Sequence, residues 1–290
     1  MSTGHYTRTL SQDDLDRLLW GVCVLGTGGG GDPRRGRAQI DMDLERGRDY
    51  RLVDVERVDD DALIVSGGFM GHMEMRASWA DTIERWEVLY ELERAVRTME
   101  RYLGRSVDYL VPFELGGGNT IAILSCAARL GIPVVDGDGI GRAAPETQMS
   151  SFFANGVSLT PMTLYDEQGG AAVVDGGDSF FPDDVGRFVV TRCGGRVANC
   201  HYPMSGEALR RSVVRGTLSD AIVLGERLER AQAESACCVD VAAKTLDANV
   251  HLVGRVALVT ERTDGGFFFS EVQIRGIGEY EGHSMTLRNN

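Results

Sequence analysis

The sequence contains no run of eighteen apolar residues, although 43% of its 290 residues are hydrophobic. A helix that crosses a bilayer needs about 20 such residues, so we expect no membrane span. The first residues, Met-Ser-Thr-Gly-His-Tyr-Thr-Arg, also lack the apolar stretch of a secretory signal peptide. The chain is therefore predicted to be a soluble cytoplasmic protein, long enough to form two lobes.

Paired cysteines and an excess of basic charge are also missing. The six cysteines form no CxxC pair, and disulfide frameworks are typical of short secreted domains, so we expect reduced thiols. Acidic residues outnumber basic ones by 43 to 30, which gives a net charge of −13. This charge argues against nucleic acid or an anionic membrane as a partner, so we predict a small-molecule substrate. The broad apolar content indicates a homo-oligomer.

Strand, glycine-rich turn and helix alternate through the first part of the chain. We predict strands at 51–55, 62–66, 108–112 and 132–135, and helices at 11–22, 34–46, 82–103 and 120–130. This alternation indicates an α/β fold, with a largely parallel sheet and flanking helices.

After about residue 164 the pattern changes to β-rich segments, among them 171–174, 188–191, 250–259 and 267–274, around one helix over 207–233. We therefore predict an α/β N-terminal lobe of residues 1–170 and a smaller, β-rich α+β C-terminal lobe of residues 171–290. The end of the chain, just after an apparent strand, suggests that the second lobe is truncated.

Three loops with polar side chains follow predicted strands, at 67–72, 114–119 and 136–146. Ligands of open α/β sheets bind beyond the carboxyl ends of the strands, so we expect these loops to meet at one crevice. His72 is a candidate metal ligand or general base, or a structural histidine. Glu114 and Asn119 flank three glycines, and they either contact a ligand or cap the next helix.

The third loop reads Asp-Gly-Asp-Gly-Ile-Gly-Arg-Ala-Ala-Pro-Glu over residues 136–146 and concentrates the most charge. Glycines between alternating acids allow Asp136 and Asp138 to point at one centre, which suits a divalent metal or an acid–base pair. The spacing of Glu146 excludes an EF-hand. Arg142 either pairs with Glu146 or clamps a substrate carboxylate, and an ordinary turn is the alternative.

A glycine loop at residues 26–31 follows a helix and fits neither a dinucleotide fingerprint nor a phosphate loop. It is interpreted as an anion site or, equally, as a tight joint between helices. Its candidate substrate-binding residues are Gly28, Gly29, Gly30 and Gly31. In the later segment Asn199-Cys200-His201, Cys200 is a candidate nucleophile and His201 a candidate metal ligand.

Four motifs, taken together, resemble one known family. They are Leu25–Pro33 (LGTGGGGDP), Glu114–Asn119 (ELGGGN), Val134–Glu146 with Gln148-Met149, and Met204-Ser-Gly206 followed by Gly216-Thr-Leu-Ser219. The resemblance is to the DUF917 family, also called the S-methyl thiohydantoin desulfurase-like family. It implies an α/β N-terminal domain, a separate C-terminal domain, and action on five-membered imidazolidine rings, hydantoins or thiohydantoins.

Two departures from the family pattern bear on the substrate. Pro203 stands where the pattern has a cysteine, and Phe69–Glu74 differs from the small-residue and proline version of that segment. The nearest cysteine is Cys200. These departures leave room for a member that acts on a different ring.

The hypothesis that follows is a hydrolase that cleaves a C–S or C–N bond with the help of a metal. Zinc or manganese, held by Asp136 or Asp138 with His72 or His201, activates water. The proton is transferred by Glu114 or Glu146, with Asp138 needed for turnover.

In the same hypothesis, Asn119, Arg142 and the Gly28–Gly31 loop hold the substrate, and Cys200 supplies an alternative mechanism without a metal. Two other functions stay open. One is a non-catalytic, metabolite-binding accessory subunit of a hydantoinase-like system. The other is a metal-free lyase or cyclase in a biosynthetic pathway.

Overall fold

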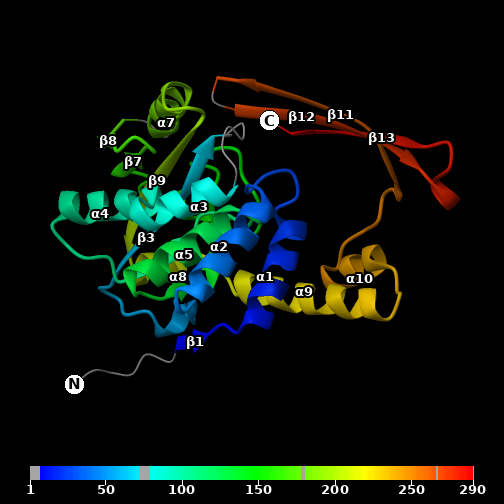
Figure 1. Ribbon diagram of the computed structural model, residues 1–290, viewed down its shortest axis with the longest axis horizontal. Helices are drawn as coiled ribbons and strands as arrows, with labels where there is room; N and C mark the ends of the chain where they lie inside the picture. Colours follow the sequence, from blue (N-terminus) through cyan, green and yellow to red (C-terminus); the bar gives the residue numbers. More distant parts are fainter. Residues whose placement is uncertain (1–6, 72–78, 178–179, 266, 290) are drawn as a thin grey trace.

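The computed structural model describes residues 7–71, 79–177, 180–265 and 267–289. Within these ranges, one large sheet with helices on both of its faces forms the body of the molecule (Figure 1). A smaller sheet, built from the last strands, lies to one side of this body and is joined to it through α10 (Cys238–Thr245). No helix in the described ranges is long and apolar enough to cross a membrane.

The large sheet combines a parallel centre with antiparallel flanks. Its parallel strands are, in spatial order, β2 (Arg51–Val53), β5 (Val134–Val135), β4 (Tyr109–Pro112) and β3 (Leu63–Gly71). The antiparallel strands are β1 (Thr7–Thr9) beside β2, and then β9 (Arg196–Ser205), β7 (Met162–Tyr165) and β8 (Ala171–Val174) beyond β3. The predicted α/β architecture is confirmed, and the complete sheet is mixed.

Both faces of the sheet are covered by helices. On one face α4 (Glu91–Leu103) and α5 (Asn119–Leu130) contact the strands, α2 (Pro33–Glu45) packs on α5, and α1 (Gln12–Leu25) packs on α9 (Thr217–Ala233). On the other face are α7 (Phe181–Arg192) and α8 (Gly206–Ser212). The remaining elements are α3 (Trp79–Val88), α6 (Ser151–Ala154), the 3₁₀ turns η1 (Val55–Arg57) and η2 (Gly278–Tyr280), and the short ladder of β6 (Gly137–Asp138) with β10 (Val214–Arg215).

Local signals set the ends of several helices. Ser11 and Asp14 form a capping box at the start of α1, which satisfies two N–H groups that the helix leaves unpaired. Asp32 caps α2, and Pro33 occupies the first turn, where its missing N–H costs nothing. Gly131 closes α5 in a left-handed conformation, with φ 71°, as predicted.

The structure corrects three predicted elements. The helix expected over 82–103 is divided into α3 and α4, because Tyr90 is extended (φ −99°, ψ 105°) and its hydroxyl donates to the Ala122 carbonyl at 3.0 Å. The helix expected over 207–233 is divided into α8 and α9 by β10. Residues 188–191, expected as a strand, form part of α7, since a short apolar run fits either period.

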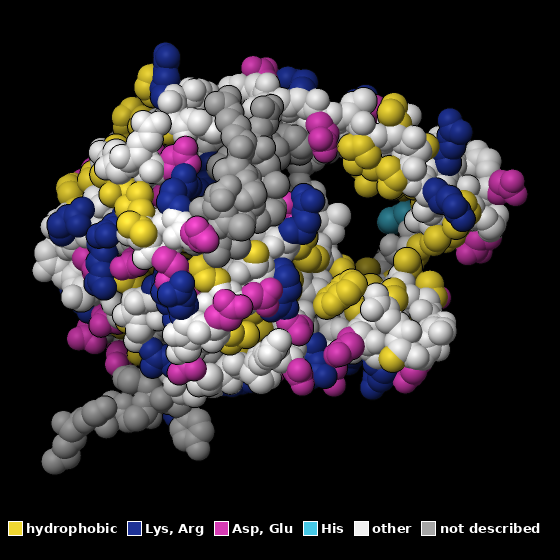
Figure 2. All heavy atoms as spheres, viewed as in Figure 1, with side chains coloured by type: hydrophobic (Ala, Val, Ile, Leu, Met, Phe, Trp, Pro, Cys, Tyr) yellow, Lys and Arg dark blue, Asp and Glu magenta, His cyan; other side chains and the backbone are white. Residues whose placement is uncertain are grey.

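The C-terminal sheet is an antiparallel arrangement of β11 (Gly254–Asp264), β12 (Phe267–Gly276) and β13 (Ser284–Asn289). Strand β11 is exposed along nearly all of its length, and Figure 2 shows an opening between this part and the body. Side-chain contacts between described residues link the sheet to the body. The Arg187 guanidinium lies 4.1 Å from the centre of the Phe267 ring, and the Asn289 side chain donates to the Gly28 carbonyl.

Candidate active site

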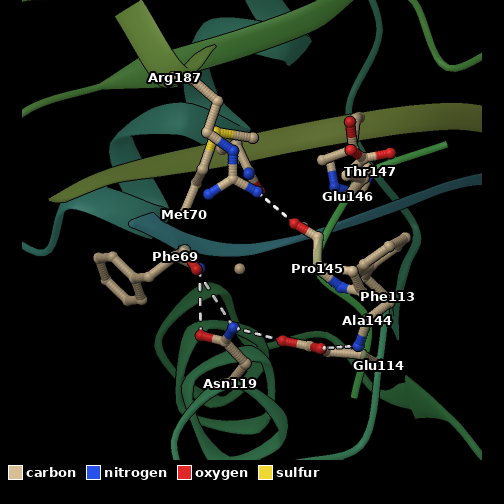
Figure 3. A pocket seen from close by; sticks show the side chains of 14 residues that line it. Phe69, Met70, Phe113, Glu114, Asn119, Ala144, Pro145, Glu146, Thr147 and Arg187 are labelled. Carbon is tan, nitrogen blue, oxygen red and sulfur yellow. Dashed lines mark hydrogen bonds between the residues drawn. The ribbon is translucent and has the colours of Figure 1, made fainter. Parts of the chain in front are cut away.

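A pocket of about 40 Å³, partly open to solvent, lies at the carboxyl edge of β3 and β4, beside β9. This is the edge at which α/β sheets bind ligands. The volume is well below the roughly 300–1,000 Å³ that is usual for small-molecule sites. Figure 3 shows Glu114 and Asn119 on one side of it and Arg187 reaching in from the other. The lining residues are Gly67, Gly68, Phe69, Met70, Phe113, Glu114, Asn119, Ala144, Pro145, Glu146, Thr147, Arg187, Asn199 and His201.

The three predicted loops contribute unequally to this pocket. Residues 67–70 end β3, Glu114 and Asn119 follow β4, and residues 144–147 come from the far end of the charged loop. The crevice expected from strand topology is therefore present. The first part of the charged loop, residues 136–142, does not line it.

Two hydrogen bonds fix the Glu114 carboxylate. Asn119 Nδ2 donates to its Oε1 at 2.7 Å, and the Ala144 backbone N–H donates to its Oε2 at 2.7 Å (Figure 3). Asn119 is itself held by Phe69, whose N–H donates to Oδ1 at 3.2 Å and whose carbonyl accepts from Nδ2 at 3.2 Å. The rotamer of Glu114 is thus determined by both neighbouring loops.

Burial raises the pKa of Glu114 to about 7, because the site gives its charge little solvation. The Asn119 and Ala144 donors and the positive charge of Arg187 lower the pKa, and the charge of Asp138 raises it. A carboxyl with such a pKa exchanges protons readily near neutral pH. It therefore suits a general acid and base.

His201 reaches the pocket because β9 contains a bulge. Ser66 pairs with His201, whereas Ile64 pairs with Met204, so β9 has one residue more than β3 over this stretch. Tyr202 sits in the bulge with φ 52°, and its ring lies on the same side of the sheet as that of His201. Bulges often re-aim side chains next to active sites. Burial lowers the pKa of His201 to about 3, so this imidazole is neutral near pH 7.

The acids of the charged loop bind protein donors. Asp136 accepts from the Ser219 N–H at 3.1 Å and from its hydroxyl at 2.5 Å, at the start of α9. Asp138 Oδ2 accepts from the N–H groups of Ile140 at 3.0 Å and Gly141 at 2.7 Å, and burial raises the pKa of Asp138 to about 6. The ordinary-turn interpretation describes these contacts well.

The other two charged residues of this loop are separated. Arg142 is exposed, while its carbonyl accepts from the Leu115 N–H at 3.2 Å. Glu146 lines the pocket, and its Oε2 accepts from Gln148 Nε2 at 2.6 Å. Of the four charged residues in the loop, only Glu146 reaches the pocket wall.

The glycine loop forms a tight joint. The Gly30 carbonyl accepts from the N–H groups of Gly118 and Asn119, each at 2.9 Å, and a Cβ on Gly30 would lie 2.4 Å from the Gly116 Cα. Gly28, Gly30 and Gly31 have positive φ, whereas Gly29 does not. The loop supports the Glu114–Asn119 segment through these hydrogen bonds, and it does not line the pocket.

Cys200 and His72 are the two remaining residues that the sequence predicted for the site. Cys200 packs in the core on the opposite side of β9, and burial raises the pKa of its thiol. It does not line the pocket. His72 lies outside the described residues.

The described residues do not by themselves assemble the predicted zinc or manganese site. Among the residues that the structure describes, no three His, Cys, Asp or Glu side chains are close enough to hold a metal ion together. Asp136 is engaged with Ser219 and does not line the pocket, whereas His201 does. These two predicted ligands are therefore not brought to one centre.

Several pocket residues were not predicted. Arg187 comes from α7, where its Nε donates to Asp183 Oδ2 at 3.2 Å, and Asp183 in turn accepts from the N–H and hydroxyl of Thr147 at 2.9 and 2.8 Å. Asn199 comes from β9. The sequence could have indicated Asn199, because it lies two residues before His201 and alternate residues of a strand share a face.

Arg35, from α2, was also not predicted. It is buried, lies 4.8 Å from the centre of the Phe69 ring, and donates through Nη2 to Asn119 Oδ1 at 3.3 Å. Burial lowers its pKa to about 10, so the guanidinium is still charged at neutral pH. No motif in the sequence indicated this contact.

Fold and site together define an α/β protein with a small acid–base pocket at a sheet edge, and family comparisons identify its relatives. The family model of the S-Me-THD-like N-terminal domain matches residues 13–176, and that of the S-Me-THD-like C-terminal domain matches residues 178–290. The chain therefore belongs to the S-Me-THD-like family, and the resemblance noted in the sequence is confirmed.

One solved structure extends the comparison. A crystal structure of a protein from Chromobacterium violaceum is 27% identical, with a TM-score of 0.71, over 97% of this chain and 74% of that one. No curated protein matches the chain.

Proposed function

We propose that this protein is a hydrolase that acts on a small hydantoin-like or thiohydantoin-like ring, with Glu114 as its general base and acid. The observation that carries the proposal is a buried carboxyl with a pKa of about 7 in the wall of a small pocket of about 40 Å³. Membership in the S-Me-THD-like family supports the choice of ring. The size of the pocket favours a compact five-membered heterocycle over an extended substrate.

In the proposed reaction, the Glu114 carboxylate takes a proton from water, and the hydroxide attacks the ring carbon that carries sulfur. A C–O bond forms and the C–S bond breaks. Glu114 returns that proton to the departing sulfur, and the second proton passes to sulfur from the new hydroxyl as the C=O bond forms. One water is thus consumed, one hydrogen sulfide is released, and an oxo ring remains. On an oxo ring, the same attack would break a ring C–N bond and open the ring, with the proton passing to nitrogen.

The surroundings of Glu114 suit both halves of this cycle. Its two hydrogen bonds, from Asn119 and Ala144, orient the carboxylate, and burial keeps its two protonation states close in free energy near pH 7. Because His201 is neutral, it offers a hydrogen bond without competing for the catalytic proton. Arg187 adds positive charge on the opposite wall.

Participation of zinc or manganese is a separate proposal, and no step above is routed through a metal. It is checked by elemental analysis of the purified protein, followed by activity measurements before and after chelation. A stoichiometric metal whose removal abolishes turnover would replace the Glu114 mechanism with a metal-assisted one. Turnover that resists chelation supports the mechanism as written.

The direct test is incubation with a panel of 2-thiohydantoins and hydantoins, with sulfide and ring-opened products measured separately. We expect release of sulfide from at least one thiohydantoin by the wild-type protein, and none by a folded Glu114→Gln variant. Binding of the rings without any product would favour an accessory subunit. Another product without consumption of water would favour a lyase or cyclase.

A further inference from the structure

Two polar side chains in the pocket wall are buried and have unpaired atoms. Asn199 is 4% exposed and His201 is 1% exposed, and neither Asn199 Oδ1 nor His201 Nδ1 has a hydrogen-bond partner within the described structure. Buried polar groups are nearly always paired, because an unpaired one loses its hydration without replacement. Two such atoms in one small pocket therefore indicate a ligand that pairs with them.

Strand register places both atoms on the pocket side of the sheet. Asn199 lies opposite Gly68 and His201 lies opposite Ser66, so the two side chains are neighbours on one face of β9. Gly68 has no side chain, and a Cβ there would lie 3.4 Å from the Asn119 side chain; Gly68, Asn119, Glu114 and Asn199 all line the same pocket. Phe113 meets the His201 ring edge to face at 5.3 Å and holds its plane.

Asn199 and His201 together offer a ligand one hydrogen-bond acceptor and, beside it, one group that can donate. The Asn199 amide oxygen accepts only, and a neutral imidazole with its proton on Nδ1 donates there. Adjacent N–H and C=O groups on one edge of a small ring are the complement of this pair. Cyclic amides, ureides and imides present such an edge, because their ring holds the amide cis.

We infer that Asn199 and His201 bind the cis-amide edge of a cyclic ureide or thioureide, which names the substrate class of the proposed function and rests on it. The ring N–H donates to Asn199 Oδ1, and the adjacent carbonyl or thiocarbonyl accepts from His201 Nδ1. In this pose the carbonyl or thiocarbonyl carbon, which is the atom that water attacks, faces Glu114. Both residues are specificity-determining, and neither transfers the catalytic proton.

The test measures binding of hydantoin and its N-methyl derivatives by calorimetry, in a Glu114→Gln background that prevents turnover. We expect Asn199→Leu to weaken hydantoin binding about tenfold to a hundredfold, while leaving the protein at least as stable to heat. The N-methylhydantoin whose methyl group replaces the N–H that donates to Asn199 should bind weakly to the parent protein. Its affinity should not fall further in Asn199→Leu. A residue with a merely structural role would not show this dependence on the ligand's N–H.

Ser66 supplies the matched control. Its hydroxyl is also buried and unpaired, on the strand position opposite His201, but Ser66 does not line the pocket. Ser66→Ala should therefore bind hydantoin like the parent protein, and His201→Phe should bind it at least tenfold more weakly. Equal affinity of the parent, Asn199→Leu and His201→Phe proteins would overturn the inference, as would absence of binding by every ring.

Turnover separates this inference from the proposed function. Release of sulfide from thiohydantoins by wild-type protein, with affinity independent of Asn199, leaves the function and removes the inference. Succinimide, a cyclic imide without sulfur, tests the inference separately from the proposed function. Binding of succinimide that depends on Asn199, with no turnover of any thiohydantoin, supports the inference and removes the function.

Discussion

Glu114 and the acids at 136–138 leave neighbouring strands of the same sheet, β4 and β5, but their carboxylates have different surroundings. Asp136 accepts two hydrogen bonds from Ser219, and Asp138 accepts two from the turn that follows it. Glu114 also accepts two hydrogen bonds, but it lines a pocket and has a pKa of about 7.

The comparison shows that local donors, rather than the number of acids, determine what a carboxylate does. In the charged loop the backbone N–H groups of Ile140 and Gly141 donate to Asp138, as N–H groups do to Asp side chains in turns. Gly116 and Gly118 instead pack against the Gly26–Gly31 loop, and Glu114, just before them in the chain, lines the pocket. Two segments of similar composition thus differ in structure: the acids at 136–138 bind groups of the protein, whereas Glu114 lines the pocket.

The largest expected effect separates Glu114 from the other glutamate in the pocket wall. Glu114→Gln should lower kcat by about 10²–10⁴-fold, the usual contribution of a general acid–base group. Glu146→Gln is the matched control, since Glu146 lines the same pocket with its carboxylate bonded to Gln148. We expect it to cost less than about tenfold. Steady-state kinetics on the best thiohydantoin decide this, and equal losses in both variants would contradict the assignment.

The second prediction concerns stability against pH. The pKa of Glu114 is about 7 in the folded protein, against an ordinary value of 4.5, so the folded state binds the proton more tightly. The free energy of unfolding should therefore fall as pH rises from about 4.5 to 7, by about 3 kcal/mol from this group. Asp138, whose pKa is raised to about 6, acts in the same direction.

Urea denaturation at pH 5 and pH 8 measures this effect. Glu114→Gln should lose most of the decline and keep only the smaller part that comes from Asp138. Because Gln must place its amide against the donor of Asn119 or Ala144, the variant starts from a lower stability at pH 5. A decline that is unchanged in Glu114→Gln would show that another group titrates.

Much of this arrangement followed from periodicity and strand topology. Glu114 and Asn119 were predicted because they follow an apolar strand, and a parallel sheet gathers such positions at one edge. Arg187 and Asn199 were not, because they come from α7 and β9. The pairing of β9 with β3 joins segments some 130 residues apart in the chain, and no local pattern records it.

The charged loop shows the opposite failure. Its composition indicated a site, but composition does not tell whether backbone N–H groups or a ligand will satisfy the acids. The metal set required Asp136 or Asp138 to meet His201 or His72. Asp136 instead lies at the start of α9, a helix that was predicted to begin ten residues earlier. The sequence therefore missed the start of α9 and, with it, the contact between Asp136 and Ser219.

The third prediction tests this structural role. Asp136→Ala should lower the free energy of unfolding by about 1–2 kcal/mol, as expected when a cap at a helix N-terminus is lost. The kcat and any bound metal should stay at wild-type levels. Ser219→Ala removes only the hydroxyl contact and should cost less. If Asp136→Ala folds well and loses turnover together with metal, the metal proposal gains and the structural role of Asp136 fails.

The smallest effect concerns Tyr202, which connects the bulge to the pocket wall. Its hydroxyl donates to the Thr147 carbonyl at 2.8 Å and accepts from the Ser150 hydroxyl at 3.1 Å. Tyr202→Phe should lower stability by about 1 kcal/mol and, because residues 144–147 line the pocket, raise KM a few-fold with kcat nearly unchanged.

Tyr202 also shows why a residue can be held at positive φ. A non-glycine residue with φ 52° costs free energy, and the surrounding contacts must compensate for it. Here the bulge puts His201 and Tyr202 on the same side of the sheet, one in the pocket wall and the other bonded to the loop that closes it. If Tyr202→Phe leaves KM unchanged, the bulge positions His201 alone, and the loop at 144–147 is held by Asp183 and Arg187 instead.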